Sequence, residues 1–94
     1  MIISVDFDDT LLIKGQPNIA LIGYLKGRQR AGDAVILNTC RGGKRLAEAI
    51  NICRQHGLMF NAVNENLPIV ITRLGYNPRK IFADLYIDDK AIKP

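Results

Sequence analysis

Short apolar runs alternate along the chain with segments in which apolar residues recur every three or four positions. Such runs are typical of strands buried in a parallel sheet, and the wider spacing is typical of helices with one buried face. The runs predict four strands, over residues 2–6, 34–39, 58–63 and 82–88.

The spaced segments predict two helices between these strands. Asn18 is a suitable N-cap for the first, which we expect to end near Gly32. The second begins at Gly42-Gly43 and ends at Gly57. The connection that precedes the first helix carries no strand pattern.

Residues 67–75 fit either a strand or a short helix. Pro68 suits the first turn of a helix, whereas the β-branched residues in 69–72 favour a strand. Asn66 can cap a helix and Gly75 can end it. We therefore expect a helix here.

Strands that alternate with helices indicate an α/β fold of right-handed βαβ units. We expect a three-layer α/β/α Rossmann-like sandwich with a small, mainly parallel sheet, in which the predicted strands lie in the order 3-2-1-4. The 94 residues make one domain, over residues 1–94, with no room for a cap domain. Since only five residues follow Asp89, we expect the fourth strand to be a bare edge that favours pairing with a second copy.

Composition excludes several classes of protein. The 48% hydrophobic content argues against disorder, and no apolar run approaches the roughly 20 residues that span a bilayer. The N-terminus lacks the basic region of a signal peptide, so we expect a cytoplasmic protein without membrane contacts. Cys40 and Cys53 are too far apart for a CxxC motif, and we expect both to be small buried hydrophobes. A single histidine excludes a histidine-rich metal site.

The net charge of +4 is unevenly distributed. Six of the nine acidic residues lie in two clusters, residues 6–9 and 84–89, so the rest of the chain has only three acids against thirteen basic residues. This excess fits a solvated basic face, or a surface that attracts anionic substrates or nucleic acid.

Four carboxylates follow two predicted strands at their carboxyl ends: Asp6, Asp8, Asp88 and Asp89. The carboxyl ends of parallel strands meet at one edge of the sheet, where ligands bind in open α/β folds. Carboxylates without histidine or cysteine suit a hard cation such as Mg²⁺. One carboxylate beside such a cation can be a nucleophile, and another can transfer protons. Asp84 lies about 13 Å from Asp88 if the segment is extended, and is expected to be only a polar residue at a strand start.

Thr39 ends the second predicted strand, and Cys40, Arg41 and a diglycine follow before the second helix. A hydroxyl, backbone amides and a helix N-terminus together can bind a phosphate group. The spacing is not that of a P-loop.

These segments resemble the haloacid dehalogenase (HAD) superfamily. Residues 5–11 (VDFDDTL), 38–41 (NTCR) and 86–89 (YIDD) are similar to three of its four motifs, in the family's order and across nearly the whole chain. The nearest likeness is to small capless phosphatases of bacterial and phage type. Asp9 departs from the glycine that is common at its position.

The resemblance implies a Mg²⁺-dependent phosphomonoester hydrolase. Asp6 would attack phosphorus and form an aspartyl-phosphate, while Asp8 would protonate the leaving oxygen and activate water. Thr39 and the amide of Cys40 would bind the phosphoryl oxygens. The metal would be held by the residues Asp6, Asp8, Asp88 and Asp89.

The family's basic site residue is less clearly placed. Lys80 is the first choice because it precedes the fourth strand, and Arg79 and Arg41 compete with it.

Without a cap, the predicted site is open, which suits a large or terminal phosphate, such as a nucleic-acid end, a carrier-linked sugar phosphate or a phosphoprotein. Two alternatives remain: a catalytically weak or inactive HAD-like module that binds Mg²⁺ and a partner, and a nucleic-acid-binding domain. A receiver-like domain would need an aspartate where the third strand ends in Asn64. A nucleic-acid-binding domain would not need the four carboxylates to converge, and the chain lacks an aromatic stacking platform, so nucleic acid is expected only as a substrate.

Overall fold

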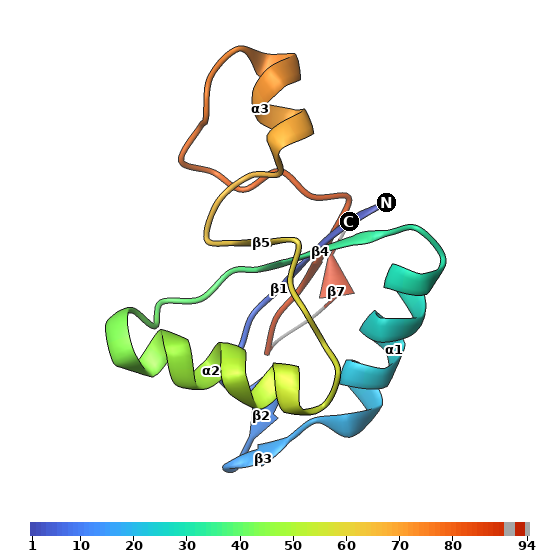
Figure 1. Cartoon of the computed structure of the whole chain (residues 1–94), viewed down its shortest axis with the longest axis vertical. Helices are drawn as coiled ribbons and strands as arrows, with labels where there is room; N and C mark the ends of the chain where they lie inside the picture. The colour runs from blue at the N-terminus through green and yellow to red at the C-terminus, as the bar shows by residue number, and fades with distance from the viewer. Residues whose placement is uncertain (90–91, 94) are drawn as a thin grey trace.

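A computed structural model describes residues 1–89 and 92–93 of the chain. It is an α/β fold whose main sheet has five strands in the order β5-β4-β1-β6-β7. The strands of this sheet are β1 (Ile2–Val5), β4 (Ala34–Leu37), β5 (Ala62–Val63), β6 (Leu85–Ile87) and β7 (Ile92–Lys93). The first four are parallel to their neighbours, and β7 is antiparallel to β6. Figure 1 shows the whole chain.

Three helices connect the parallel strands: α1 (Ile19–Arg30), α2 (Gly43–Gln55) and α3 (Pro68–Leu74). The apolar spacing predicts the first two, and the helix expected at residues 67–75 is also confirmed. Asn18 caps α1 by accepting a hydrogen bond from the amide of Leu21. Gly75 ends α3 in the left-handed conformation, at φ 79°. No helix in the described part of the chain is long and apolar enough to cross a membrane.

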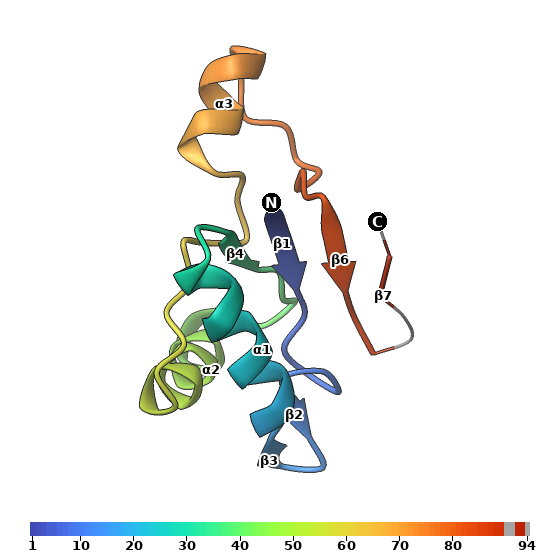
Figure 2. The same ribbon diagram turned by 90° about the vertical axis from the view of Figure 1, so that its right-hand side faces the viewer.

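Alternate residues of the strands pack on the two faces of the sheet. Ile3, Val5 and Leu37 belong to a buried cluster with residues of both α1 and α2. Cys53 of α2 lies in this cluster, and burial raises the pKa of its thiol to about 11. On the other face, Ile36 packs in a smaller cluster with residues that flank α3. Figure 2 shows α3 beyond the amino end of β1, away from α1 and α2.

All four strands are shorter than the sequence predicts. The strands predicted over 2–6 and 34–39 end early, at Val5 and Leu37, and the other two begin late. Residues 58–61 lie outside β5, where the Asn61 side chain accepts the hydrogen bond from Val35 N at 2.8 Å in place of a backbone carbonyl. Residues 82–84 lie outside β6. There Phe82 N donates to the Asn66 side chain and Ala83 N donates to the Tyr86 hydroxyl. In both cases a side chain takes over a backbone hydrogen bond, which apolar periodicity does not record.

Two strand pairs are absent from the sequence-based prediction. β2 (Leu12–Ile13) and β3 (Gln16–Pro17) form a hairpin whose turn residues, Lys14 and Gly15, both have positive φ. The sequence signal for this hairpin is a two-residue turn that ends in glycine. β7 pairs with β6, so the prediction that the fourth strand is a bare edge is wrong.

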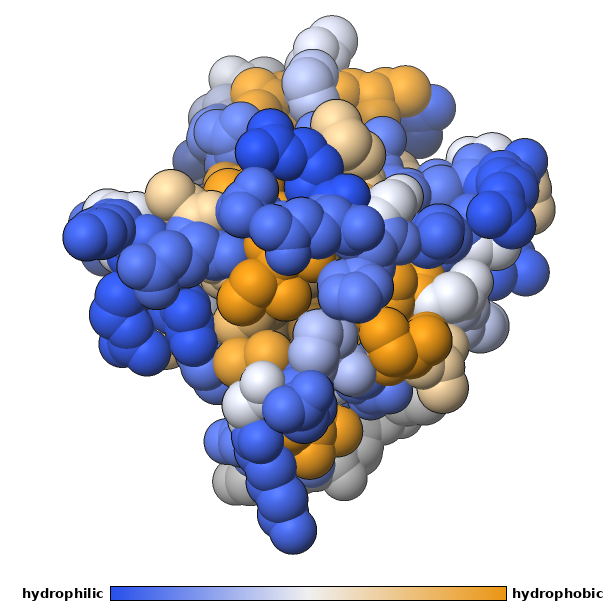
Figure 3. All heavy atoms as spheres, turned by 60° about the horizontal axis from the view of Figure 1, so that its bottom comes forward, coloured by the Kyte–Doolittle hydropathy of each residue, from blue (hydrophilic) through white to orange (hydrophobic). Residues whose placement is uncertain are grey.

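Two smaller predictions are also wrong. The N-cap of α3 is Leu67, without a side-chain hydrogen bond, because the Asn66 side chain bonds to the segment before β6 instead. Cys40 is exposed, because it lies in the loop beyond β4. Figure 3, a view from the side of β2 and β3, shows a mostly hydrophilic face with smaller apolar groups between the polar ones.

Candidate functional site

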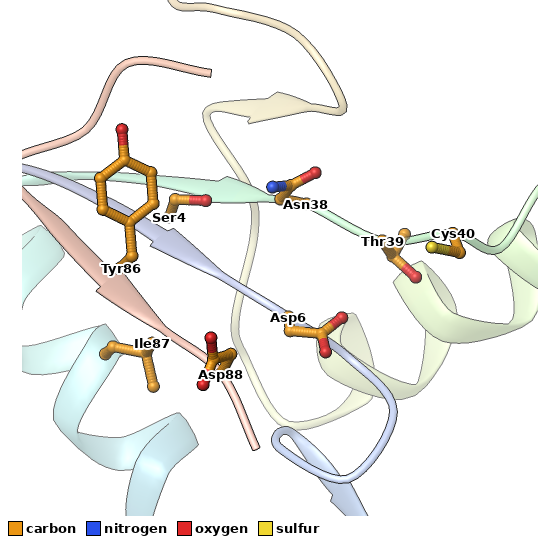
Figure 4. A pocket seen from close by; sticks show the side chains of 8 residues that line it. All are labelled: Ser4, Asp6, Asn38, Thr39, Cys40, Tyr86, Ile87 and Asp88. Atoms are coloured by element: carbon orange, nitrogen blue, oxygen red, sulfur yellow. The ribbon is translucent and has the colours of Figure 1, made fainter. Parts of the chain in front are cut away.

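A cavity of about 320 Å³ lies where β1, β4 and β6 end. Asp6 follows β1, Asn38 follows β4 and Asp88 follows β6, so the parallel strands bring these side chains to one edge. Figure 4 shows them with the other lining residues. The full lining is Ser4, Asp6, Asn38, Thr39, Cys40, Tyr86, Ile87 and Asp88.

Ser4 and Tyr86 extend the cavity along one face of the sheet. Each lies two residues before a lining aspartate, and side chains two apart on a strand point to the same face. Ser4 is 3% exposed although it is polar. The sequence-based analysis did not assign Ser4, Asn38 and Tyr86 to the site. For Ser4 and Tyr86 this two-residue spacing was the usable signal, and for Asn38 it was the position directly after β4.

Asp6 is held at its position by the backbone. Its amide donates to the Ile87 carbonyl at 3.0 Å, and its carboxylate accepts from Phe7 N at 2.8 Å. Burial raises the pKa of Asp6 above its usual value, and nearby carboxylates, Asp8 foremost, add to the rise, against the lowering by the Phe7 amide. The site therefore holds negative charge that a bound cation would stabilise.

Asp8 does not line the cavity. Its two carboxylate oxygens accept hydrogen bonds from Arg41, at 3.0 Å from Nε and 2.9 Å from Nη2. This guanidinium lowers the pKa of Asp8, chiefly through the side-chain hydrogen bond. Of the two carboxylates that the first motif places two residues apart, Asp6 thus lines the cavity and Asp8 is bound to Arg41 beside it.

The loop after β4 is fixed by one hydrogen bond to another segment and one within the loop. Thr39 N donates to the Asn64 side chain at 2.7 Å, and the Thr39 hydroxyl accepts from Arg41 N at 3.1 Å. Asn64, at φ 54°, is a positioning residue that the sequence-based analysis missed. The helix that follows, α2, begins at Gly43, and its N-cap Gly42 makes no side-chain hydrogen bond, so its first amides remain available to an anion.

The remaining predicted residues lie outside the cavity. Lys80 and Arg79 are exposed in the segment before β6 and are not among the lining residues. Asp89 and Asp9 are exposed as well, and Asp9 has φ 61°. Of the three competing basic residues, Arg41 is the one whose side chain contacts a predicted catalytic carboxylate.

The donor atoms at the strand ends fit a hard divalent cation. Asp6 and Asp88 contribute carboxylate oxygens to the cavity, and burial, with the neighbouring carboxylates, raises the pKa of Asp6, an effect that a bound cation would oppose. Within the described residues, no three acidic, histidine or cysteine side chains form a group that could hold a metal ion. Backbone oxygens, substrate and water would therefore complete the coordination, as is usual for Mg²⁺.

The chain is similar to the solved structure of a conserved protein from Bacteroides thetaiotaomicron. The two are 38% identical, with a TM-score of 0.82, and the match covers 97% of this chain and 77% of that one. No family model and no curated protein matches the sequence.

Proposed function

The chain belongs to the same family as this conserved protein from Bacteroides thetaiotaomicron, and we propose that it is a Mg²⁺-dependent phosphomonoester hydrolase of the HAD superfamily. The observation that carries the proposal is the position of Asp6 in a cavity with Thr39 and Asp88 at the ends of three parallel strands. The proposal includes the three-layer Rossmann-like class with the predicted strands in the order 3-2-1-4. It is supported by the two apolar clusters on opposite faces of the sheet.

In the proposed reaction, a carboxylate oxygen of Asp6 attacks phosphorus and the phosphorus–oxygen ester bond breaks. The leaving oxygen takes a proton from Asp8. Water then attacks phosphorus, Asp8 accepts its proton, and Asp6 is released with inorganic phosphate. Thr39 and the following amides bind the phosphoryl oxygens throughout.

Mg²⁺, held by the Asp6 and Asp88 carboxylates and the Asp8 carbonyl with Asp89 nearby, would neutralise charge on the phosphoryl group. The cavity includes the exposed residues Asn38 and Cys40, so it opens to the surface. An open cavity supports a terminal phosphate on a large molecule as substrate.

The test is hydrolysis of p-nitrophenyl phosphate in the presence of MgCl₂. We expect Asp6→Asn to lower kcat about a thousandfold or more, because the amide is no nucleophile. Asp84→Asn is the matched control, since Asp84 lies outside the cavity and bonds to Ile2 N. Equal activity of wild type and Asp6→Asn contradicts the mechanism.

One observation favours the alternative of a binding module without catalysis. Asp8, the proposed acid and base, is paired with Arg41 outside the cavity. A wild-type chain that binds Mg²⁺ and phosphate but forms no product would support this alternative.

A further inference from the structure

The ion pair between Asp8 and Arg41 occupies both partners in a two-point contact. Nε and Nη2 of Arg41 each bind a separate oxygen of the Asp8 carboxylate, at 3.0 and 2.9 Å. This geometry is the one in which arginine binds carboxylates and phosphates alike. In this state both Asp8 oxygens are bound to Arg41 and Asp8 is not among the residues that line the cavity with Asp6, where its proposed role would use it.

The two partners differ in how firmly they are held. The Arg41 side chain is 12% exposed, its guanidinium lies 4.7 Å from the centre of the Phe7 ring, and Nη1 donates to the Arg45 carbonyl at 3.3 Å. The Asp8 side chain is 48% exposed. When the pair opens, Asp8 can therefore turn into solvent while Arg41 stays in place.

Arg41 also belongs to the loop that lines the cavity. Its amide donates to the Thr39 hydroxyl, and Thr39 and Cys40 line the cavity with Asp6. A phosphoryl dianion at this loop carries more charge than one carboxylate and offers oxygens that match the guanidinium fork. The Arg41 side chain is only 12% exposed and is costly to leave unpaired, so an arriving phosphoryl anion favours the departure of Asp8.

We propose that Arg41 is a positioning residue that exchanges partners: it holds Asp8 aside until a phosphoryl group enters, and then binds the phosphoryl oxygens and releases Asp8. The inference rests on the proposed function, because it assigns the cavity a phosphoryl ligand. It makes the release of the acid–base carboxylate depend on the arrival of the substrate.

Partner exchange has a measurable cost. Asp8 competes with the ligand for Arg41, so the apparent affinity for phosphate is the intrinsic affinity multiplied by the fraction of molecules in which the pair is open. Removing the competitor should therefore tighten phosphate binding. A purely structural ion pair would not produce this effect.

The experiment measures orthophosphate binding to the whole chain by calorimetry in MgCl₂. We expect Asp8→Asn to lower the Kd about tenfold. Arg41→Lys should raise it about tenfold or more, because lysine keeps the charge but cannot form the two-point contact. Asp9→Asn is the matched control: it removes one negative charge from the same exposed loop, and asparagine tolerates the positive φ of that residue. We expect it to change the Kd no more than about twofold.

A nitrogen-15 spectrum gives a second readout. The Nε–H signal that Arg41→Lys removes should shift when orthophosphate is added to the wild type. In Asp8→Asn it should already be shifted before the addition.

The outcomes separate this inference from the proposed function. Equal Kd values for Asp8→Asn and Asp9→Asn overturn the exchange, even if the wild type hydrolyses phosphate esters through Asp6. Tighter binding by Asp8→Asn supports the exchange, even if the wild type hydrolyses nothing and the proposed function fails. An absence of phosphate binding in every variant overturns both.

Discussion

The two ends of the parallel sheet carry carboxylates in opposite circumstances. At the amino end, Asp33 pairs with the N-terminal ammonium at 2.8 Å and with Arg28, and Asp84 accepts from Ile2 N at 2.7 Å. At the carboxyl end, Asp6 accepts one backbone hydrogen bond, and no basic side chain of the described residues forms an ion pair with it.

The pKa shifts of Asp33 and Asp6 show the same difference. The N-terminal ammonium, with Arg28, lowers the pKa of Asp33, whereas burial and neighbouring carboxylates raise that of Asp6. Ionised Asp33 therefore stabilises the fold, whereas ionised Asp6 opposes it unless a cation binds. A site that costs stability is where function is expected.

The largest expected difference between the two ends of the sheet is in Mg²⁺ binding. We expect Asp88→Asn to weaken Mg²⁺ binding about a hundredfold, because it removes a charged oxygen ligand from the cavity. Asp84 directly precedes β6 and therefore lies at the amino end of the same strand. Asp84→Asn should leave the Mg²⁺ affinity unchanged. Calorimetric titration with MgCl₂ measures both, and equal affinities would mean that the cavity is not the metal site.

A second prediction concerns stability alone. The buried Asn66 side chain holds the segment before β6 through hydrogen bonds with Pro78 O, Lys80 O and Phe82 N. We expect Asn66→Ala to lower the free energy of unfolding by about 2–3 kcal/mol, because buried backbone groups lose their partner. Urea denaturation measures this change.

The control is Asn77→Ala, which removes only a 3.5 Å contact with the same side chain. We expect it to cost less than about 0.5 kcal/mol. Mg²⁺ affinity should be unaffected in both variants, and a large loss in Asn66→Ala would show that the segment contributes to the metal site.

The smallest expected effect is on the pH dependence of stability, which has opposite signs for Asp33 and Asp6. Thermal unfolding in the presence of EDTA measures it. The folded pKa of Asp33 lies below the unfolded value of about 3.9, so its stabilisation is complete above that value and lost as pH falls through the folded pKa. We therefore expect Asp33→Asn to lower the Tm at pH 7 by a few degrees and much less near pH 2.

The contribution of Asp6 to stability changes with pH in the opposite direction. Its folded pKa is raised, so the wild type loses stability relative to Asp6→Asn as pH rises from the unfolded pKa through the folded one. Asp6→Asn should unfold at a higher temperature than the wild type at pH 7, and at a similar temperature near pH 2. A lower Tm for Asp6→Asn at pH 7 would contradict the comparison of the two ends.

Much of the fold was predictable because local signals and burial agree. The mainly apolar run before Asp6 forms β1 (Ile2–Val5), and Asn18 and Gly75 act at helix ends as their chemistry predicts. The shortened strands were not predictable, because Asn61 and Asn66 replace backbone partners across the chain.

The candidate site divides in the same way. Asp6, Thr39 and Asp88 come together because each follows a parallel strand, a relation that the order of elements contains. The position of Lys80 outside the cavity depends on how its loop folds, and no local pattern records that path.

By itself, the sequence determined an α/β chain with a mainly parallel sheet and acidic residues at the carboxyl ends of its strands. These features follow from periodicity and strand polarity, which are properties of neighbouring residues. The tertiary structure alone decided that Asp8 pairs with Arg41, 33 positions away, and that β7 covers the edge of β6. Such contacts depend on where the whole backbone brings distant side chains, and that is settled only when the sheet and its helices have packed.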